Sequence, residues 1–341
     1  MRSFENKVAL VTGSAGFIGF FVCRKLLDEG WRVIGLDCLS DYYDVSLKQK
    51  REKLLQKSQN YISVRGKIQD RDRLRSLFDI ERPNLVIHLA AQAGVRYSII
   101  NPRSYLDNNI IGTFELLEAA REFPPKHMLL ASTSSAYGIN DKLPFCEIDK
   151  SDHQVSFYAA TKKSTENLAH SYSHLYHLPI TMFRFFTVYG PWGRPDMAFF
   201  KFTRSILKGE PIDVYNHGEM ERDFTYIDDL VRAIWLLVDV VPSKMKLSDR
   251  PLFDSLSPVA PFRTVNIGNS KTTKLSNFIE AIEEVTEIRA VKNLMPMQAG
   301  DVPVTWASVK LLKHLINYVP DTEIKFGVKA FVDWYRDYYQ E

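Results

Sequence analysis

The sequence predicts an α/β fold, a doubly wound parallel sheet with a smaller C-terminal lobe. In the first half of the chain, short apolar and β-branched runs alternate with longer amphipathic runs. That alternation is typical of parallel strands joined by right-handed helical crossovers. From about Thr187 it gives way to turn residues and shorter elements. We therefore expect one domain over residues 1–186 and a substrate-binding lobe over residues 187–341, with segments of the lobe returning to the first domain.

Six strands are expected in the first domain, each a run of strand length rich in apolar residues. They cover residues 8–12, 32–36, 61–64, 85–88, 127–131 and 180–185. Helical patterns lie between them, most clearly over residues 104–121 and 158–176. In the second half, the stretch 242–261 is rich in Pro, Ser and Asp and predicts an exposed loop. The C-terminal aromatic residues have helical spacing and are expected in the core: Phe331, Trp334, Tyr335 and Tyr338.

A glycine-rich turn follows the first strand. Gly13, Gly16 and Gly19 lie between that strand and an amphipathic helical pattern. Glycines in this context form a tight turn that lets the backbone approach a pyrophosphate at the helix N-terminus. An ordinary glycine turn is the alternative, but the strand, the spacing and the acid described next favour nucleotide binding.

Asp37 ends the next strand, about 20 positions after the glycines, where an acid binds the ribose hydroxyls. A carboxylate there favours NAD, because it would repel a 2′-phosphate. The first domain is therefore predicted to be a Rossmann-type NAD-binding domain. The residues expected at the cofactor are Gly13, Gly16, Phe17, Ile18, Gly19 and Asp37.

Tyr158 and Lys162 are four residues apart in a predicted helix, so their side chains share one face. A phenol titrates near ~10 in water, and a nearby ammonium lowers its pKa. The pair is thus a candidate general base for a sugar or alcohol hydroxyl. A half-buried Tyr beside a solvated Lys is the plainer interpretation, and the glycine turn is what favours catalysis.

Hydroxyl residues follow the fifth predicted strand. Ser132, Thr133, Ser134 and Ser135 come directly after residues 127–131. Ligands of doubly wound sheets bind at the carboxyl ends of strands. These side chains are suited to a substrate hydroxyl, a carboxylate or a developing oxyanion, although Ser/Thr-rich turns are also common.

Composition excludes several classes of function. Of the 341 residues, 45% are hydrophobic and 25% charged, as in ordinary soluble globular proteins. The net charge of +3 is too small to indicate a nucleic-acid or membrane-surface partner. The 3 cysteines, Cys23, Cys38 and Cys146, form no Cys-x-x-Cys pair, which favours a reducing cytoplasm.

We also expect no secretory signal, because the first strand begins near the start, and no transmembrane segment. His170, His174 and His177 lie near one face of a predicted helix without an acidic ligand pattern. We therefore expect a solvated face and no metal site there.

Together these motifs resemble those of the extended short-chain dehydrogenase/reductases, which act on nucleotide sugars. The resemblance rests on the glycine turn, the Ser/Thr cluster before Tyr137 and Gly138, the Tyr158/Lys162 pair and the run 222–229. It extends over essentially the whole chain. Within the family the sequence is most similar to UDP-glucuronate 4-epimerases, on the runs 41–44, 90–98 and 190–197.

The resemblance implies NAD as cofactor and a mechanism. Tyr158 would take the proton of the sugar 4-hydroxyl while hydride leaves C4 for NAD⁺. Lys162 would lower the pKa of Tyr158 and hold the nicotinamide ribose, and Thr133 would hydrogen-bond the 4-oxygen. The 4-keto sugar would then turn and take the hydride back on its other face, so that the cofactor is regenerated.

The residues after Thr133 separate the reaction classes of the family. Similar dehydratases carry an Asp-Glu pair there, and similar decarboxylases carry a Glu, whereas this chain has Ser134 and Ser135, which favours epimerisation. By resemblance, Ser134, Ser135, Thr187 and Arg194 would hold the uronic carboxylate, Arg222 would bind the diphosphate, and Arg96 would also contact the substrate.

The sequence departs from its relatives at three positions. Lys67 replaces an Asp often found near the adenine, which moves adenine recognition to backbone groups at Ile68. Cys38 stands where Asn is frequent. Thr187 stands where UDP-glucose epimerases carry Asn, which argues against that activity.

Two alternatives stay open. One is a 4-epimerase of neutral UDP-sugars (UDP-glucose/UDP-galactose or N-acetyl forms), and the other is a non-catalytic NAD-binding sensor. By resemblance, the helices 104–121 and 158–176 would pair across a two-fold axis in a homodimer.

Overall fold

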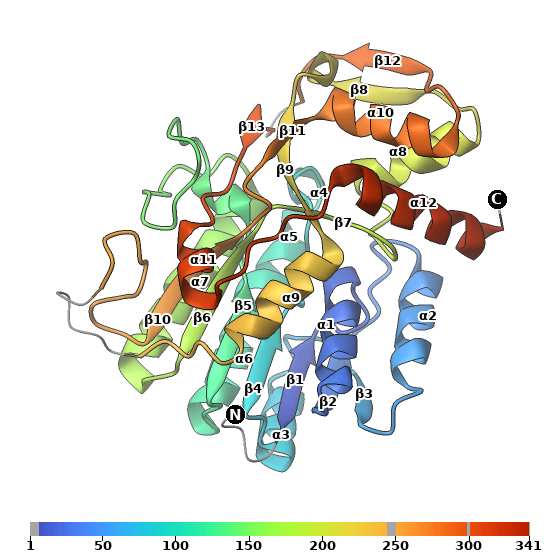
Figure 1. Cartoon of the computed structure of the whole chain (residues 1–341). Helices are drawn as coiled ribbons and strands as arrows, with labels where there is room; N and C mark the ends of the chain where they lie inside the picture. Colours follow the sequence, from blue (N-terminus) through green and yellow to red (C-terminus); the bar gives the residue numbers. More distant parts are fainter. Residues whose placement is uncertain (1–6, 244–249, 299–300, 341) are drawn as a thin grey trace.

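The computed structural model describes residues 7–243, 250–298 and 301–340. Its centre is a seven-stranded sheet in the order β10-β6-β5-β4-β1-β2-β3, and every neighbouring pair is parallel. The strands are β1 (Val8–Thr12), β2 (Arg32–Asp37), β3 (Tyr61–Arg65), β4 (Leu85–His88), β5 (His127–Ala131), β6 (Ile180–Phe185) and β10 (Phe262–Ile267). Successive strands are added on one side of β1 up to β3 and on its other side from β4 onward, so the strand order reverses between β1 and β4, which is where doubly wound folds bind their ligands (Figure 1).

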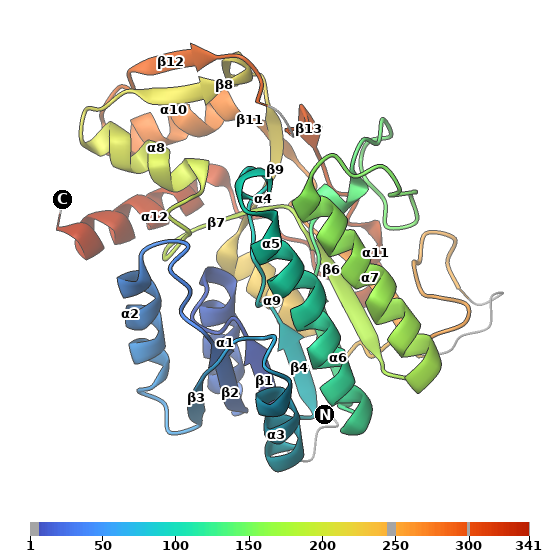
Figure 2. The ribbon, with the colours of Figure 1, turned by 180° about the vertical axis from the view of Figure 1, so that it is seen from behind.

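Helices cover both faces of this sheet (Figures 1 and 2). Successive side chains of a strand point to opposite faces of a sheet, and both faces of β1 are apolar. Ala9 and Val11 belong to one apolar core, and Leu10 belongs to the other. The first core includes α1 (Phe17–Asp28), α2 (Val45–Leu55), α9 (Ile227–Leu237) and α11 (Lys310–Ile316). The second includes α3 (Arg71–Glu81), α6 (Gly112–Glu122) and α7 (Phe157–Tyr176).

The remaining elements form a lobe above the carboxyl ends of the strands (Figures 1 and 2). A mixed sheet joins β7 (Thr187–Tyr189), β9 (Glu221–Tyr226), β11 (Thr272–Lys274) and β13 (Val304–Thr305). Beside it, β8 (Ile212–Tyr215) pairs with β12 (Lys292–Met295), and the lobe's helices are α8 (Ala198–Leu207), α10 (Leu275–Thr286) and α12 (Ile324–Tyr339).

The predicted α/β class is confirmed, and the six predicted strands agree with the structure to within one residue. The helix expected over 104–121 is a composite of α5 (Pro102–Tyr105), a π-helical turn η1 (Leu106–Ile111) and α6. Pro102 is tolerated because it occupies the first turn of this helix. Apolar spacing gives no indication of the π turn, which we find only in the structure.

Two smaller expectations were wrong in part. Of the stretch 242–261, residues 244–249 lie outside the described residues, and the rest is not simply exposed, since Asp254, Leu256 and Ala260 are buried. His170 and His174 contact this stretch through Ser257 Oγ (2.9 Å) and the Val259 carbonyl (3.0 Å). A long loop is thereby packed against α7, where we had expected solvent.

Of the four C-terminal aromatic residues predicted in the core, Phe331 and Tyr335 are buried, whereas Trp334 and Tyr338 are only partly buried. Trp334 and Tyr338 pack against Trp192, with ring centroids 5.3 and 5.2 Å away. Within the residues that the structure describes, no helix has both the length and the apolar character needed to cross a bilayer.

Candidate active site

Three adjoining cavities lie where the lobe meets the carboxyl ends of the central strands. The cofactor cavity, of about 280 Å³, is lined by the glycine turn, Asp37, Ile68, Thr133, Tyr158 and Lys162. The sugar cavity, about 270 Å³, and the outer cavity, about 430 Å³, open from it toward the lobe. Arg194 and Met197 line all three, so the cavities meet at this point.

The glycine turn has the geometry that a dinucleotide needs. Gly13 adopts a φ of +71° and donates its N–H to the Leu36 carbonyl at 2.8 Å. A Cβ on Gly19 would lie 2.0 Å from the Gly13 oxygen, so a side chain cannot be placed there without moving the turn. The turn leads into α1, whose first residues Phe17 and Ile18 line the cofactor cavity. Backbone N–H groups at this helix start are suited to a pyrophosphate.

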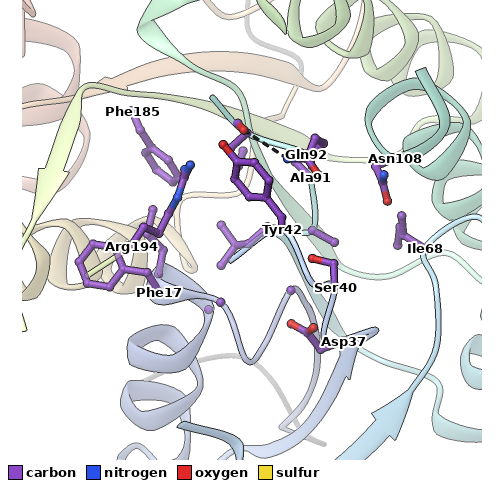
Figure 3. Close-up of a pocket in the computed structure, with 18 of the residues that line it drawn as sticks. Phe17, Asp37, Ser40, Tyr42, Ile68, Ala91, Gln92, Asn108, Phe185 and Arg194 are labelled. Carbon is purple, nitrogen blue, oxygen red and sulfur yellow. Dashed lines mark hydrogen bonds between the residues drawn. The ribbon is translucent and has the colours of Figure 1, made fainter. Parts of the chain in front are cut away.

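Asp37 belongs both to the turn and to the cavity wall. Its carboxylate accepts hydrogen bonds from the backbone N–H groups of Ala15 (3.0 Å) and Leu39 (2.7 Å). The same side chain lines the cofactor cavity, between Ile68 and Asn108 on one side and Phe185 and Arg194 on the other (Figure 3). A fixed negative charge at this place favours ribose hydroxyls over a 2′-phosphate.

Ile68, predicted to contribute to adenine recognition, lines one end of the cofactor cavity, and its role there stays a prediction. Ile68 is 5% exposed and lines the wall together with Gly66 and Asn108. Lys67 is exposed and is not part of the lining. Cys38 is exposed and does line the cavity. This end is therefore lined by Gly66, Ile68 and Asn108, without a carboxylate from residue 67.

Thr133 and Tyr158 stand at the junction of the cofactor and sugar cavities, and Lys162 lies on the cofactor side. The helix that carries Tyr158 and Lys162 begins at Ser156, whose hydroxyl oxygen accepts from Ala159 N at 3.1 Å. Lys162 is 3% exposed. Burial lowers the pKa of Lys162 to about 8, and the Glu166 carboxylate opposes that shift.

The pKa of Tyr158 is raised, chiefly by burial, while a hydrogen bond with Thr133 and the charge of Arg194 act in the opposite direction. The net direction is opposite to the lowering that the Tyr158–Lys162 spacing suggested. Thr133 and Arg194 each favour the phenolate form of Tyr158. Burial outweighs both of them, so the net effect favours the protonated phenol.

A buried ion pair holds the catalytic segments together from below. Glu166 lies one turn beyond Lys162 and accepts two hydrogen bonds from the Arg184 guanidinium, at 2.8 and 2.7 Å. It also accepts from the Ser132 hydroxyl at 2.6 Å. These bonds join α7, β6 and the end of β5, so the positions of Tyr158 and Thr133 are fixed relative to each other.

The structure brings five of the six predicted substrate residues to the sugar cavity, and these are Ser134, Ser135, Thr187, Arg194 and Arg222. The sixth, Arg96, lines the outer cavity together with Thr187, Arg194 and Arg222. Ser134 and Ser135 open the short turn η2 (Ser134–Tyr137), which Thr133 caps by accepting from Ser135 N at 3.2 Å. The two positions after Thr133, where similar dehydratases and decarboxylases carry acids, thus place serines in the wall of the sugar cavity.

The guanidinium of Arg194 already has a carboxylate partner. It donates to Asp196 twice, at 3.0 Å from Nε and 2.5 Å from Nη2, and Tyr42 donates to the same carboxylate at 3.2 Å. The predicted partner of Arg194 is a substrate carboxylate, whereas its partner in the structure is Asp196. A bidentate internal pair reduces the charge that Arg194 offers to a ligand.

The two other arginines share an acidic neighbour. Arg96 pairs with Asp301 at 3.2 Å and lies 5.0 Å from the Tyr215 ring centroid. Arg222 donates to the Pro303 carbonyl at 3.0 Å. Burial lowers the pKa of Arg222, whereas Asp301 raises it. Asp301 is not predicted from the sequence, because nothing near residue 301 indicates that it lies close to residues 96 and 222.

Other lining residues were also missed. Lys48 of α2 is 5% exposed, lines the cofactor cavity and donates to the Ser40 carbonyl at 2.5 Å. Burial lowers the pKa of Lys48, and Asp37 opposes that shift. Tyr42, Gln92 and Phe186 line the same cavity. The runs 41–44 and 90–98 had indicated two of these segments through resemblance alone.

Comparison with known proteins agrees with this geometry. The model of the NAD dependent epimerase/dehydratase family matches residues 9–246. A Rhizobium meliloti (strain 1021) protein named "Probable UDP-glucuronate 4-epimerase" is 50% identical over 332 residues, which cover 97% of each chain. UDP-glucuronate 4-epimerase 4 of Arabidopsis thaliana is 46% identical over 335 residues, 97% of this chain and 75% of that protein.

The chain belongs to the NAD-dependent epimerase/dehydratase family.

Solved structures of the family have the same fold. The UDP-glucuronic acid 4-epimerase of Bacillus cereus, in complex with UDP-glucuronic acid and NAD, matches with a TM-score of 0.87 and 31% identity, covering 97% of this chain and 100% of that one. The UDP-glucose 4-epimerase of Thermotoga maritima with UDP-glucose matches with a TM-score of 0.84 and 30% identity, covering 97% and 99%. The predicted family and the predicted cofactor, NAD, are confirmed. Across the described residues, no group of three His, Cys, Asp or Glu is placed to hold a metal ion.

Proposed function

We propose that this epimerase interconverts UDP-glucuronate and UDP-galacturonate by inverting C4 through a transient 4-keto sugar. One observation carries the proposal most directly. Thr133 and Tyr158 line both the cofactor cavity and the sugar cavity, so a hydroxyl in the second cavity is within reach of a base beside the first. The relatives named as UDP-glucuronate 4-epimerases support the same substrate.

Bound NAD would accept a hydride from C4 and return it to the opposite face of the sugar. Tyr158 would take the proton of the 4-hydroxyl as general base and give it back when the hydroxyl reforms. Thr133 would hydrogen-bond the 4-oxygen and stabilise the phenolate of Tyr158. Lys162, buried on the cofactor side, would hold the ribose hydroxyls and supply positive charge near the phenolate.

The sugar cavity would have to hold the carboxylate of a uronic acid. We assign that task to the hydroxyls of Ser134, Ser135 and Thr187, with Arg194 nearby. A 4-keto uronic acid is a β-keto acid, and it loses CO₂ when the bond from C5 to its carboxylate lies parallel to the π orbital of the C4 carbonyl. Neutral hydroxyls hold the group without acting as acids or bases near neutral pH. Arg222 and Arg96 would bind the diphosphate in the outer cavity.

The proposal extends to domains, assembly and location. Residues 1–186 would form the NAD-binding domain and residues 187–341 mainly the UDP-sugar lobe, although β10 lies in the central sheet. α6 and α7 would pair with those of a second copy in a homodimer, which is supported by exposed Phe114 (39%) and Leu175 (60%) on their surface. The free thiols of Cys23, Cys38 and Cys146 are in keeping with a cytoplasmic enzyme.

The experiment is to incubate the protein with UDP-glucuronate and to identify the product by proton NMR. UDP-galacturonate is expected, at constant total NAD and without added oxidant. UDP-glucose, UDP-galactose and their N-acetyl forms serve as parallel substrates. Absence of UDP-galacturonate from a protein that carries NAD would contradict the proposal.

A neutral-sugar 4-epimerase is the second candidate, and one contact favours it. Because Asp196 occupies the fork of Arg194, the sugar cavity has less positive charge than the sequence suggested. Conversion of UDP-glucose faster than UDP-glucuronate would decide for this candidate. A non-catalytic NAD sensor would convert neither sugar.

A further inference from the structure

Arg51 is a buried arginine to which the reaction proposed above gives no role. Its exposed fraction is 0%. It lies in α2, behind the cofactor cavity and outside the lining of the three cavities. In both views of the molecule, the segment between β7 and α8 passes the upper end of α2 (Figures 1 and 2).

The two amino groups of Arg51 hold two different segments. Nη1 donates to the Ala15 carbonyl, in the glycine turn, at 3.0 Å and to the Tyr43 hydroxyl at 3.0 Å. Nη2 donates to the Trp192 carbonyl at 2.5 Å and to the Gly193 carbonyl at 3.4 Å. One planar, rigid group thus bridges the turn that faces the cofactor and the segment that leads directly into Arg194.

The charge of Arg51 makes this bridge sensitive to movement. Its four acceptors among the described residues are uncharged oxygens, and a buried cation is tolerated only while such dipoles solvate it. If the segment that contains Trp192 and Gly193 moved away, Nη2 of Arg51 would lose both of its acceptors. Because Arg51 is fully buried, water would not readily replace them. The positions of this segment and of the glycine turn are therefore energetically linked.

We propose that Arg51 is a positioning residue that couples retention of NAD to occupancy of the nucleotide-sugar site. The inference rests on the proposed function, because it takes the second ligand to be a UDP-sugar. Arg194 follows Gly193 and lines all three cavities, so a ligand that fixes Arg194 also fixes the acceptors of Nη2. Through Nη1 the same ligand stabilises the glycine turn around the cofactor. The coupling is reciprocal, as linkage requires.

The test measures the rate at which the NAD-loaded protein releases NAD, with and without saturating UDP. Released NAD is consumed by excess alcohol dehydrogenase and ethanol and is followed as NADH absorbance. UDP should slow release from the wild type by roughly tenfold, within the usual range of coupling between sites. In Arg51→Met, UDP should slow release by less than about twofold, and in Arg51→Lys by an intermediate factor. Release without UDP should also be faster in both variants.

Lys53→Met is the matched control, because it removes an exposed cation from the same helix and should behave as wild type. Thermal unfolding shows whether each variant is folded. If Arg51→Met does not fold, Arg51→Lys provides the same measurement with a smaller change. A purely structural role would speed release equally with and without UDP, which would overturn the coupling. A wild type that binds UDP in calorimetry without any slowing of NAD release would overturn it too and leave the proposed function intact. A wild type that fails to bind UDP would instead refute the proposed UDP-sugar site.

Discussion

One part of the wall of the cofactor cavity, the glycine turn, comes from one short stretch of chain, whereas the wall of the sugar cavity is assembled from distant segments. Residues 13–19 form this turn beside Asp37, and the backbone itself makes the decisive shape there. The second wall draws on η2, β7, β9 and the segment around Arg194. A site made by backbone shape is encoded locally, and a site made by converging side chains is encoded by the whole fold.

The largest effect is expected where the two walls meet. Tyr158→Phe should keep the fold and NAD but lower turnover by about two to four orders of magnitude, the usual contribution of a general base. Steady-state epimerisation of UDP-glucuronate, with bound NAD determined after desalting, checks this. Tyr176→Phe, which removes a half-exposed hydroxyl from the same helix, is the control. Turnover within tenfold of wild type would remove Tyr158 from the mechanism.

A backbone test addresses the cofactor wall alone. Gly19→Ala places a methyl group 2.0 Å from the Gly13 oxygen, so the turn must shift. Overpacking of this kind costs about 1–3 kcal/mol, and we expect it as weaker NAD binding in calorimetry. Gly16→Ala, where the new Cβ would be 3.0 Å from the same oxygen, should cost less. Equal losses for the two variants would show that the shape of the turn does not control NAD binding.

These two walls explain what the sequence predicts and what it does not. Gly13, Gly19 and Asp37 were predictable because their roles follow from backbone geometry at fixed spacing. Asp301 was not, because its pairing with Arg96 depends on how the lobe folds over the sheet. Asp196 is only two residues from Arg194, but that spacing does not by itself indicate that the two side chains form a bidentate pair. Substrate residues such as Thr187 and Arg222 were reached through family resemblance, since nothing in their local sequence distinguishes them from surface residues.

The π turn in η1 and the burial of Arg51 are not predicted from the sequence, because apolar periodicity does not indicate either of them. Apolar periodicity reports which face of a helix is buried, but it does not report a change in helical register. It also does not reveal that a charged residue is enclosed when its partners are carbonyls from residues 15, 192 and 193.

The pH dependence of the reaction tests helix α7, which carries Tyr158, Lys162 and Glu166. Burial lowers the pKa of Lys162 to about 8, so its ammonium is present below that pH and is lost above it. Turnover should therefore decline above pH 8, by about tenfold per pH unit once the group is neutral. Glu166 raises the pKa of Lys162, so Glu166→Gln should move this alkaline limb to lower pH. A limb that does not move would indicate that another group titrates, and Glu118→Gln on α6 is a control for removing a carboxylate elsewhere.

The smallest effect is expected at the sugar wall, where several donors share one ligand group. Ser135→Ala should weaken binding of UDP-glucuronate by about 1.5 kcal/mol, the low end for a hydrogen bond to a charged group, because Ser134 and Thr187 remain. UDP-glucose should be affected much less, since it has no carboxylate. Calorimetry with the two nucleotide sugars gives this difference directly.

A second consequence of Ser135→Ala distinguishes a carboxylate site from a general contact with the sugar. With one donor lost, the bond from C5 to the carboxylate of the 4-keto intermediate is held less firmly away from the π orbital of the C4 carbonyl, and part of the intermediate should lose CO₂ before the hydride returns. The variant should then release CO₂ and accumulate bound NADH during turnover of UDP-glucuronate, whereas wild type should do neither.

Asp196→Asn should change binding in the opposite direction to Ser135→Ala. It frees the charge of Arg194 for the substrate and should strengthen binding of UDP-glucuronate relative to UDP-glucose. If both variants affect the two sugars equally and neither releases CO₂, the sugar wall does not hold a carboxylate, and the neutral-sugar epimerase becomes the better description of this site.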